Sequence, residues 1–223
     1  LRIDTRRSAE LGDRVQLAMT FPTEFRSVQA NYPIMFRKTG DEDFMPVALF
    51  GFDKNENLFL SESGWDAHYV PAMIRKEPFL IGTQGEDEEA ARVLSLDLDN
   101  PRVNKEEGEA LFGALGEMTP FLEGQTSMLE VIYEGVQQNQ RFVKALLEQD
   151  LLESVTFDIT LKDGSRNSLL GFYTIDEEKI PELSAETLNL MNRNDMLMPL
   201  FMVLASLGNV QRLIERKNRT LDD

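Results

Sequence analysis

Residues 31–82 read NYPIMFRKTGDEDFMPVALFGFDKNENLFLSESGWDAHYVPAMIRKEPFLIG. They contain the only Trp and the only His of the chain, and two of its four Tyr. Three prolines, Pro33, Pro71 and Pro78, stand beside apolar runs in the same stretch. This concentration of aromatic side chains is typical of a specified core or of a binding surface.

The first half of this stretch predicts a β-hairpin. Pro33 cannot donate a backbone hydrogen bond, so a strand should begin after it, at residues 34–37. Residues 39–41 read Thr-Gly-Asp and predict a turn, and residues 47–52 form the returning strand. Because that strand is apolar throughout and contains Gly51, we expect it to be covered on both faces, or to have another backbone passing close to Gly51.

A second hairpin is predicted at residues 154–175. Residues 154–161 alternate apolar and polar side chains, residues 162–165 read Lys-Asp-Gly-Ser, and residues 168–175 return. The order of Phe, Asp-Gly and Leu-Gly-Phe in this hairpin parallels that of the first. We therefore predict two hairpin units, at about 32–60 and 154–175, in one mostly antiparallel sheet, as an internal structural repeat.

Helical periodicity predicts the rest of the architecture. Apolar residues recur three or four apart in residues 127–150, which predicts one long helix or two helices joined near Gln138. Residues 105–115, 184–194 and 195–217 predict further helices, and residues 91–98 predict a strand. Residues 13–19 fit either an edge strand or an unpaired arm. The fold class is therefore α+β, with the sheet packed against central and C-terminal helices in a single domain over residues 1–223.

Several short motifs resemble the SapC family, a bacterial family named after a protein associated with a paracrystalline surface layer (S-layer). The similarity is weaker after residue 82 but extends over most of the chain. The matching positions are Tyr32-Pro33-Ile34, Pro46, Ala48-Leu49, Gly51, Glu56-Asn57-Leu58-Phe59, Gly64-Trp65, Tyr69-Val70-Pro71-Ala72, Arg75, Pro78-Phe79, Leu170-Gly171-Phe172, Ile175-Asp176-Glu177 and Ala205-Ser206-Leu207. The resemblance implies an S-layer-related role and does not imply a reaction.

Composition excludes several classes of partner. The chain has 39 acidic and 23 basic residues, a formal net charge of −16, which opposes binding to nucleic acid and to anionic membranes. No apolar run approaches the roughly 18 residues of a membrane span. Residues 1–12 lack the apolar middle of a signal peptide, so we expect a cytoplasmic protein, or a cell-surface or periplasmic protein if a leader was removed.

The familiar catalytic and metal-binding motifs are missing. With no Cys and one His, the common zinc and iron sites lack ligands, and a serine-hydrolase triad has only His68 as its base. Neither a nucleophile elbow nor a phosphate-binding glycine loop is found. The acidic run at residues 85–89 lacks the spacing of a calcium loop, and Asp97 and Asp99 fit a strand-end turn as well as a carboxylate pair. We predict no cofactor and no metal.

The candidate binding residues lie in the aromatic stretch. Trp65, His68 and Tyr69 fall at i, i+3 and i+4, so one helical turn would present all three, with Arg75 nearby and Asn57 upstream. Such a set could stack on a sugar or an aromatic side chain while Arg75 pairs with a carboxylate. Alternatively, Trp65 and Tyr69 join the hairpins and Arg75 pairs with an internal acid. A separate feature is the group of four methionines between residues 191 and 202, which fits either core filling or an adaptable binding groove.

By elimination, we expect a noncatalytic binding or accessory protein that acts on a peptide, a glycan or a surface protein. One alternative is an enzyme that uses carboxylates in a cleft near Trp65, as glycosidases do. A second alternative is a self-assembling protein associated with a surface layer, which would form homo-oligomers.

Overall fold

Five antiparallel strands form the larger sheet, in the order β11–β12–β3–β4–β2. The computed structural model describes residues 1–41, 43–84 and 91–221. Leu49 of β4 faces Leu17 of β2, which confirms the edge-strand alternative for residues 13–19. The strands are β2 (Leu17–Met19), β3 (Ile34–Lys38), β4 (Phe44–Leu49), β11 (Leu152–Thr160) and β12 (Arg166–Ile175).

Both predicted hairpins are confirmed, and they share this sheet. β3 pairs with β4, β11 pairs with β12, and the two hairpins meet where Tyr173 of β12 faces Phe36 of β3. A Cβ atom added at Gly51 would lie 2.7 Å from the carbonyl oxygen of Glu56, so another backbone does pass close to Gly51. The α+β class is thus confirmed, whereas the internal repeat and the single domain stay predictions.

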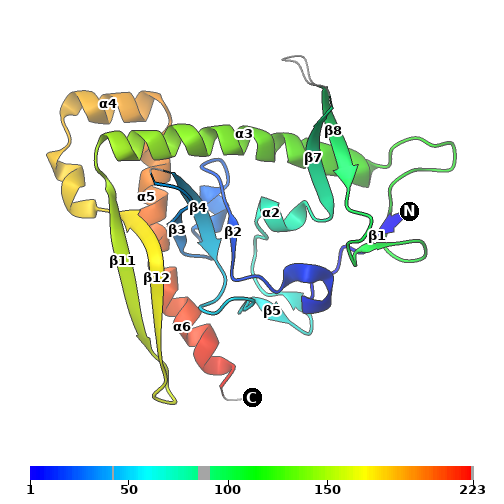
Figure 1. Ribbon diagram of the computed structural model, residues 1–223, viewed down its shortest axis with the longest axis horizontal. Coiled ribbons are helices and arrows are strands. Elements are labelled where there is room, and N and C mark those ends of the chain that lie inside the picture. The colour runs from blue at the N-terminus through cyan, green and yellow to red at the C-terminus, as the bar shows by residue number, and fades with distance from the viewer. Residues whose placement is uncertain (42, 85–90, 222–223) are drawn as a thin grey trace.

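One long helix, α3 (Pro120–Glu148), connects the two ends of an elongated molecule (Figure 1). Its 29 residues confirm the single-helix alternative, without a joint at Gln138. Thr119 caps the helix, because its hydroxyl accepts a hydrogen bond from the N–H of Leu122, and Pro120 occupies the first turn, where no N–H is needed.

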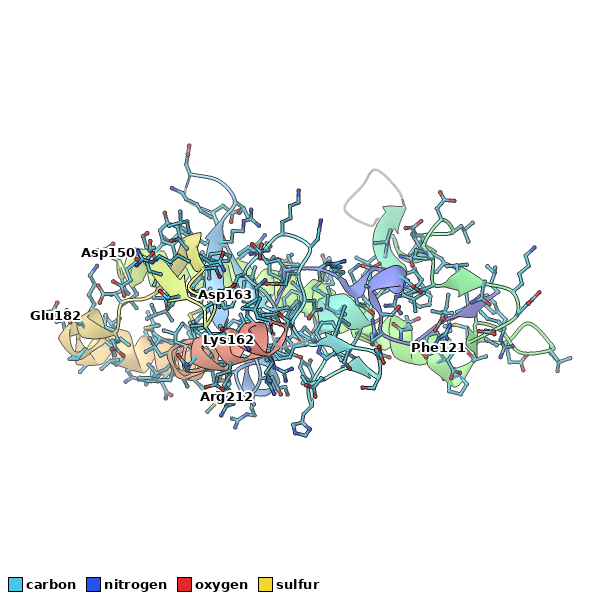
Figure 2. The ribbon with its side chains drawn as sticks, turned by 90° about the horizontal axis from the view of Figure 1, so that it is seen from below. Phe121, Asp150, Lys162, Asp163, Glu182 and Arg212 are labelled. Atoms are coloured by element: carbon cyan, nitrogen blue, oxygen red, sulfur yellow. The ribbon has the colours of Figure 1, made fainter. Side chains whose placement is uncertain are left out.

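Helix α3 contributes to two hydrophobic cores. Phe142, Val143 and Leu146 pack into the larger core, beneath the five-stranded sheet. Leu122 and Leu129, nearer the N-terminus of α3, pack into a smaller core. Figure 2 shows the same separation from below, with Glu182 near one end of the molecule and Phe121 towards the other.

Short strands surround the smaller core, whose largest buried side chains are Phe21 and Phe79. The strand predicted at residues 91–98 is confirmed as β8, which pairs with β7. The acidic run at residues 85–89 lies outside the described residues. The strands at this end are β1 (Arg2–Ile3), β7 (Phe79–Gln84), β8 (Ala91–Leu96), β9 (Val103–Asn104) and β10 (Glu109–Ala110).

The helix expected at residues 105–115 is wrong. β10 occupies part of this segment and pairs with β1, where Ile3 faces Glu109. Gly108 has a φ of 92°, which favours glycine, and a Cβ at that position would meet the carbonyl of Ile3. The missing side chain at Gly108 thus lets β1 approach closely. Pairing with β1, about a hundred residues away in sequence, therefore overrides the local helical pattern.

Helices cover the larger sheet and follow the predicted C-terminal pattern, with one break. Residues 195–217 were expected as one helix, but the chain forms α5 and α6, with Leu207 and Gly208 between them. Ser206 at the end of α5 accepts a hydrogen bond from the N–H of Ile34 at 2.8 Å, which fixes the helix to β3. The helical elements here are α1 (Phe25–Val28), η2 (Glu177–Glu182), α4 (Ala185–Arg193), α5 (Leu197–Ser206) and α6 (Asn209–Arg219).

By length and composition alone, the stretch Leu197–Arg219 is apolar enough to cross a membrane. In this fold it forms α5 and α6, and Leu200, Val203 and Leu213 are buried in the larger core. A core helix passes the same test of length and composition, so the expectation of no membrane span stays a prediction.

A buried ion pair anchors the N-terminal segment. The guanidinium of Arg102 lies 2.6 Å from the carboxylate of Asp13, and both side chains are almost fully buried. Arg102 also donates to the carbonyls of Asp4 and Arg6, and Arg7 lies 3.3 Å from the other Asp13 oxygen. Asp13 ends a short π-helix, η1 (Ala9–Asp13), so this pairing holds the segment between β1 and β2.

Candidate functional site

The predicted aromatic residues are joined by a chain of hydrogen bonds. Trp65 donates its indole N–H to the hydroxyl of Tyr32 at 2.7 Å, and that hydroxyl donates to the carbonyl of Tyr69. The Tyr69 hydroxyl donates to the Glu24 carboxylate at 2.8 Å. The polar atoms of these aromatic side chains are therefore used inside the protein.

Glu24 is the centre of this network. Its carboxylate is buried and also accepts hydrogen bonds from the Thr20 hydroxyl at 2.8 Å and from the N–H of Ala72 at 3.0 Å. Ala72 begins the short helix α2 (Ala72–Arg75), so Glu24 satisfies an N–H that the helix leaves free. Glu24 thus fixes the position of α2 relative to α1.

Burial makes both tyrosines weaker acids. It raises the pKa of Tyr32 well above its ordinary value, and the indole N–H of Trp65 only partly opposes this rise. Burial also raises the pKa of Tyr69, helped by the negative charge of Glu24 and opposed by the nearby guanidinium of Arg75. Both phenols are neutral hydrogen-bond donors at physiological pH.

The predicted helical turn at residues 65–70 is wrong. Gly64 and Trp65 form the strand β6 (Gly64–Trp65), which pairs with β5 (Leu60–Ser61), and residues 66–70 are not helical. Gly64 has a φ of 109°, a conformation incompatible with a helix start. The next helix, α2, begins after Pro71.

The structure brings some of the candidate residues together and separates others. Trp65 and Tyr69 are half-buried and linked through Tyr32, and Arg75 is exposed beside Tyr69. His68 is exposed. Asn57 is buried, and its amide bonds the carbonyl of Asp13 and the N–H of Phe59, so its contacts are structural.

Acidic side chains near Trp65 already have partners. Asp66 lies 2.8 Å from the guanidinium of Arg216, and Glu24 is satisfied as described. At the other end of the molecule, the carboxylate of Asp97 accepts from the N–H of Asp99, which is the strand-end turn that the sequence allowed. Among the described residues, no three His, Asp or Glu side chains gather as a metal site would require.

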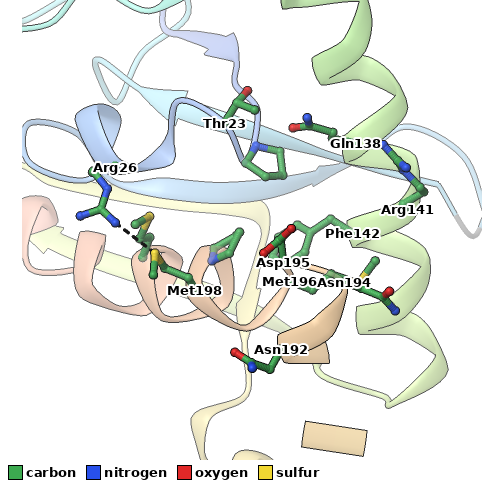
Figure 3. A pocket seen from close by; sticks show the side chains of 13 residues that line it. Thr23, Arg26, Gln138, Arg141, Phe142, Asn192, Asn194, Asp195, Met196 and Met198 are labelled. Carbon is green, nitrogen blue, oxygen red and sulfur yellow. Dashed lines mark hydrogen bonds between the residues drawn. The ribbon is translucent and has the colours of Figure 1, made fainter. Parts of the chain in front are cut away.

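A pocket of about 740 Å³ opens between α1, α3 and α5 (Figure 3). Its apolar wall is formed by Phe142, by Met198, Pro199 and Met202 of α5, and by Pro22 and Met196, and polar side chains surround that wall. The lining residues are Pro22, Thr23, Arg26, Gln138, Arg141, Phe142, Asn192, Asn194, Asp195, Met196, Met198, Pro199 and Met202.

Two arginines line this pocket from different helices. Arg26 approaches from α1 and Arg141 from α3, on opposite sides of the opening (Figure 3). Arg26 donates to the sulfur of Met198 at 3.1 Å, and within the described part of the chain neither arginine forms an ion pair. In a chain of net charge −16, these arginines leave a local positive site, in which Asp195 is the one acidic lining residue.

The methionine pattern separates into the two roles that the sequence allowed. Met191 is buried in the larger core, whereas Met196, Met198 and Met202 line the pocket. Met198 is also 57% exposed, and Phe201, which follows it on α5 outside the pocket lining, is 49% exposed. The sequence thus contained one signal for this pocket, but Arg26 and Arg141 lie too far apart along the chain to be recognised as a pair.

A second pocket, of about 820 Å³, lies between α3 and the β3–β4 turn. Its charged lining side chains, Asp43, Lys144 and Glu148, have mixed signs, and Lys144 lies 3.8 Å from Glu148. The charged side chains of the second pocket therefore give no excess of positive charge.

The family can be assigned from the sequence as a whole. The family model described as SapC matches residues 1–213. The chain belongs to the SapC family. The match includes all elements that form the pocket and the aromatic network, so both are parts of the SapC fold in this chain. No curated protein and no solved structure matches this SapC protein at a significant level.

Proposed function

We propose that this SapC protein is a noncatalytic binding protein, and that its pocket between α1, α3 and α5 binds a peptide segment with apolar side chains and a carboxylate. The observation that carries the proposal is the pair formed by Arg26 and Arg141, free of ion pairs within the described chain, on either side of a methionine-lined wall.

Each part of the lining matches one part of such a ligand. Guanidinium groups bind carboxylates with two parallel hydrogen bonds, which gives both affinity and orientation. Methionine side chains are flexible and polarisable, so they adapt to apolar side chains of different shape. The amides of Gln138, Asn192 and Asn194 can donate to and accept from a peptide backbone.

A peptide fits this lining better than a glycan. Sugar rings are typically bound by stacking on exposed aromatic faces, and Phe142, the one aromatic lining residue, is 2% exposed. The apolar surface of Met198 and Phe201 extends outward from the pocket along α5. This extension gives room for a chain that continues beyond the pocket.

The test uses two short peptides, acetylated at the N-terminus and amidated at the C-terminus, that differ in one residue, Leu-Phe-Glu-Leu and Leu-Phe-Lys-Leu. We expect calorimetry to show binding of the Glu peptide and at least tenfold weaker binding of the Lys peptide, because two guanidinium groups attract one and repel the other. The variants Arg26→Ala and Arg141→Ala should each weaken binding of the Glu peptide by about tenfold, the effect of losing about 1.4 kcal/mol.

Two control variants locate the ligand. Arg166→Ala removes the same charge from an exposed position at the start of β12, and should leave binding unchanged. Arg75→Ala tests the site beside Tyr69 that the sequence predicted. Loss of binding in Arg75→Ala with normal binding in Arg26→Ala and Arg141→Ala would move the ligand to that site and overturn the proposal.

A further inference from the structure

At the opposite end of the molecule, the loop at residues 111–118 carries large apolar side chains into solvent. Leu115 is 95% exposed, Phe112 is 54% exposed and Met118 is 41% exposed. Single exposed apolar residues are common on protein surfaces, but three on one short loop indicate an interaction site.

Internal hydrogen bonds hold this loop in shape. The N–H of Gly113 donates to the carbonyl of Glu117 at 2.8 Å, and the N–H of Leu115 donates to the Glu117 carboxylate at 3.0 Å. Gly116 has a φ of 86°, which the tight turn requires. Leu115 is therefore held away from the body of the protein by contacts that involve the loop alone.

The loop and the pocket have complementary chemistry. The loop presents apolar side chains beside the carboxylate of Glu117. The pocket presents methionines beside Arg26 and Arg141. In this acidic chain, an apolar surface with a positive rim is therefore available for an apolar loop with a negative charge.

The loop cannot reach the pocket of its own chain. It ends just before Pro120, the first residue of α3, and the pocket begins at Gln138, eighteen residues further along the same helix. A helix rises 1.5 Å per residue, so a rigid span of about 27 Å separates the two surfaces. Figure 1 shows the loop that precedes α3 at one side of the molecule and α5, which lines the pocket, towards the other.

We propose that the pocket binds residues 111–118 of a second copy of this chain, so that copies associate head to tail. This inference rests on the proposed function and names the peptide that the pocket would bind. Because the two contacting surfaces differ, each copy keeps one free pocket and one free loop, and the association continues into chains or closes into a ring. The exposed apolar face of α5 beside the pocket enlarges the contact.

The first experiment measures the mass of the protein by analytical ultracentrifugation over a wide range of concentration. The wild-type protein should form dimers and longer species as concentration rises. Leu115→Glu places a charge on the loop tip and should remain monomeric, as should Arg141→Glu, which reverses one charge of the pocket. Leu170→Glu, at another exposed leucine (65%), should associate like the wild type.

Mixing the two monomeric variants gives the sharpest result. Leu115→Glu keeps an intact pocket, and Arg141→Glu keeps an intact loop, so one productive contact remains between them. An equimolar mixture should form dimers that do not grow further. A synthetic peptide of residues 110–119 should also bind Leu115→Glu and fail to bind Arg141→Glu.

Three outcomes would overturn this inference. One is a wild-type protein that stays monomeric at all concentrations, and a second is association that Leu115→Glu and Arg141→Glu leave unchanged. The third is binding to phosphatidylcholine vesicles that Leu115→Glu abolishes, which would assign the loop to a lipid surface. A monomeric protein that still binds the Leu-Phe-Glu-Leu peptide through Arg141 would refute the self-association and leave the proposed function intact.

Discussion

Trp65 donates its indole N–H to the hydroxyl of Tyr32 at 2.7 Å, and the two rings meet edge to face, with centroids 6.5 Å apart. The link joins β6 to the start of β3. Replacing Trp65 with Phe keeps an aromatic ring but removes the donor, so the Tyr32 hydroxyl loses a partner in a largely buried place. We expect the free energy of unfolding to fall by about 1–3 kcal/mol, measured by urea unfolding followed by circular dichroism.

The control for this change is His68→Ala, three residues away and exposed, which should alter the free energy of unfolding by less than about 0.5 kcal/mol. Equal effects of the two substitutions would show that the hydrogen bond contributes nothing to stability.

Two glycines in α3 should respond to alanine with opposite signs. At Gly124 nothing lies within 4 Å of an added Cβ, so Gly124→Ala should raise the free energy of unfolding by about 0.5–1 kcal/mol through helix propensity. At Gly135 the added Cβ would lie 2.5 Å from the ring of Phe21, which is buried in the smaller core. Gly135→Ala should therefore lower stability by about 1–3 kcal/mol. Thermal unfolding of both variants checks this, and a stabilised Gly135→Ala would contradict the close packing of Phe21 on α3.

The ion pair between Arg102 and Asp13 should matter more than any surface pair. Arg102→Met leaves the buried carboxylate of Asp13 with the guanidinium of Arg7 and the N–H of Ser8. We expect the free energy of unfolding to fall by about 3–5 kcal/mol, because an incompletely compensated charge stays buried. Lys144→Ala breaks the pair between Lys144 and Glu148, whose side chains are 77% and 59% exposed, and should cost less than about 1 kcal/mol. Chemical denaturation of the two variants measures both losses of unfolding free energy. Similar losses would contradict the importance of burial.

Acid should weaken the protein partly through Asp4. The hydrogen bond from Arg6 holds the pKa of Asp4 below its ordinary value of 3.8 in the folded state, although burial opposes this. The folded protein therefore binds this proton less readily than the unfolded chain. The stabilisation is fully present above the ordinary pKa and is lost as pH falls through the folded value.

The variant Asp4→Asn isolates that contribution. Its melting temperature should be lower than that of the wild type at neutral pH, and the difference should shrink as the pH is lowered from about 5 to about 2. A difference that is constant over this range would show that the charge of Asp4 is not responsible.

Local patterns were sufficient to predict much of the fold. Both hairpins of the larger sheet follow from alternating side chains and from glycine-containing turns. Helical periodicity predicted α3 over residues 127–150, but not its start at Pro120. Gly51 even indicated the close approach of another backbone. The contacts that determine the hairpins and α3 join residues that are close in sequence, and the close approach at Gly51 depends on glycine alone.

Contacts between distant residues account for what was missed. The segment at residues 105–115 looked helical, but β1 captures part of it as β10. Trp65 was placed on a helical turn, whereas its strand pairs with Leu60 and its indole bonds Tyr32. The pocket brings Arg26, Arg141 and Met198 together from three helices, and nothing in the spacing of these residues along the chain indicates that they meet.

The sharing of α3 between two cores limits how this protein can be dissected. The N-terminal segment also serves both, since Ile3 belongs to the smaller core and Ala18 to the larger one. Residues of the larger core lie both between and after those of the smaller core along the chain, so no single cut separates the two cores. We expect limited proteolysis to yield no autonomously stable fragment, and heat to melt both ends in one cooperative step.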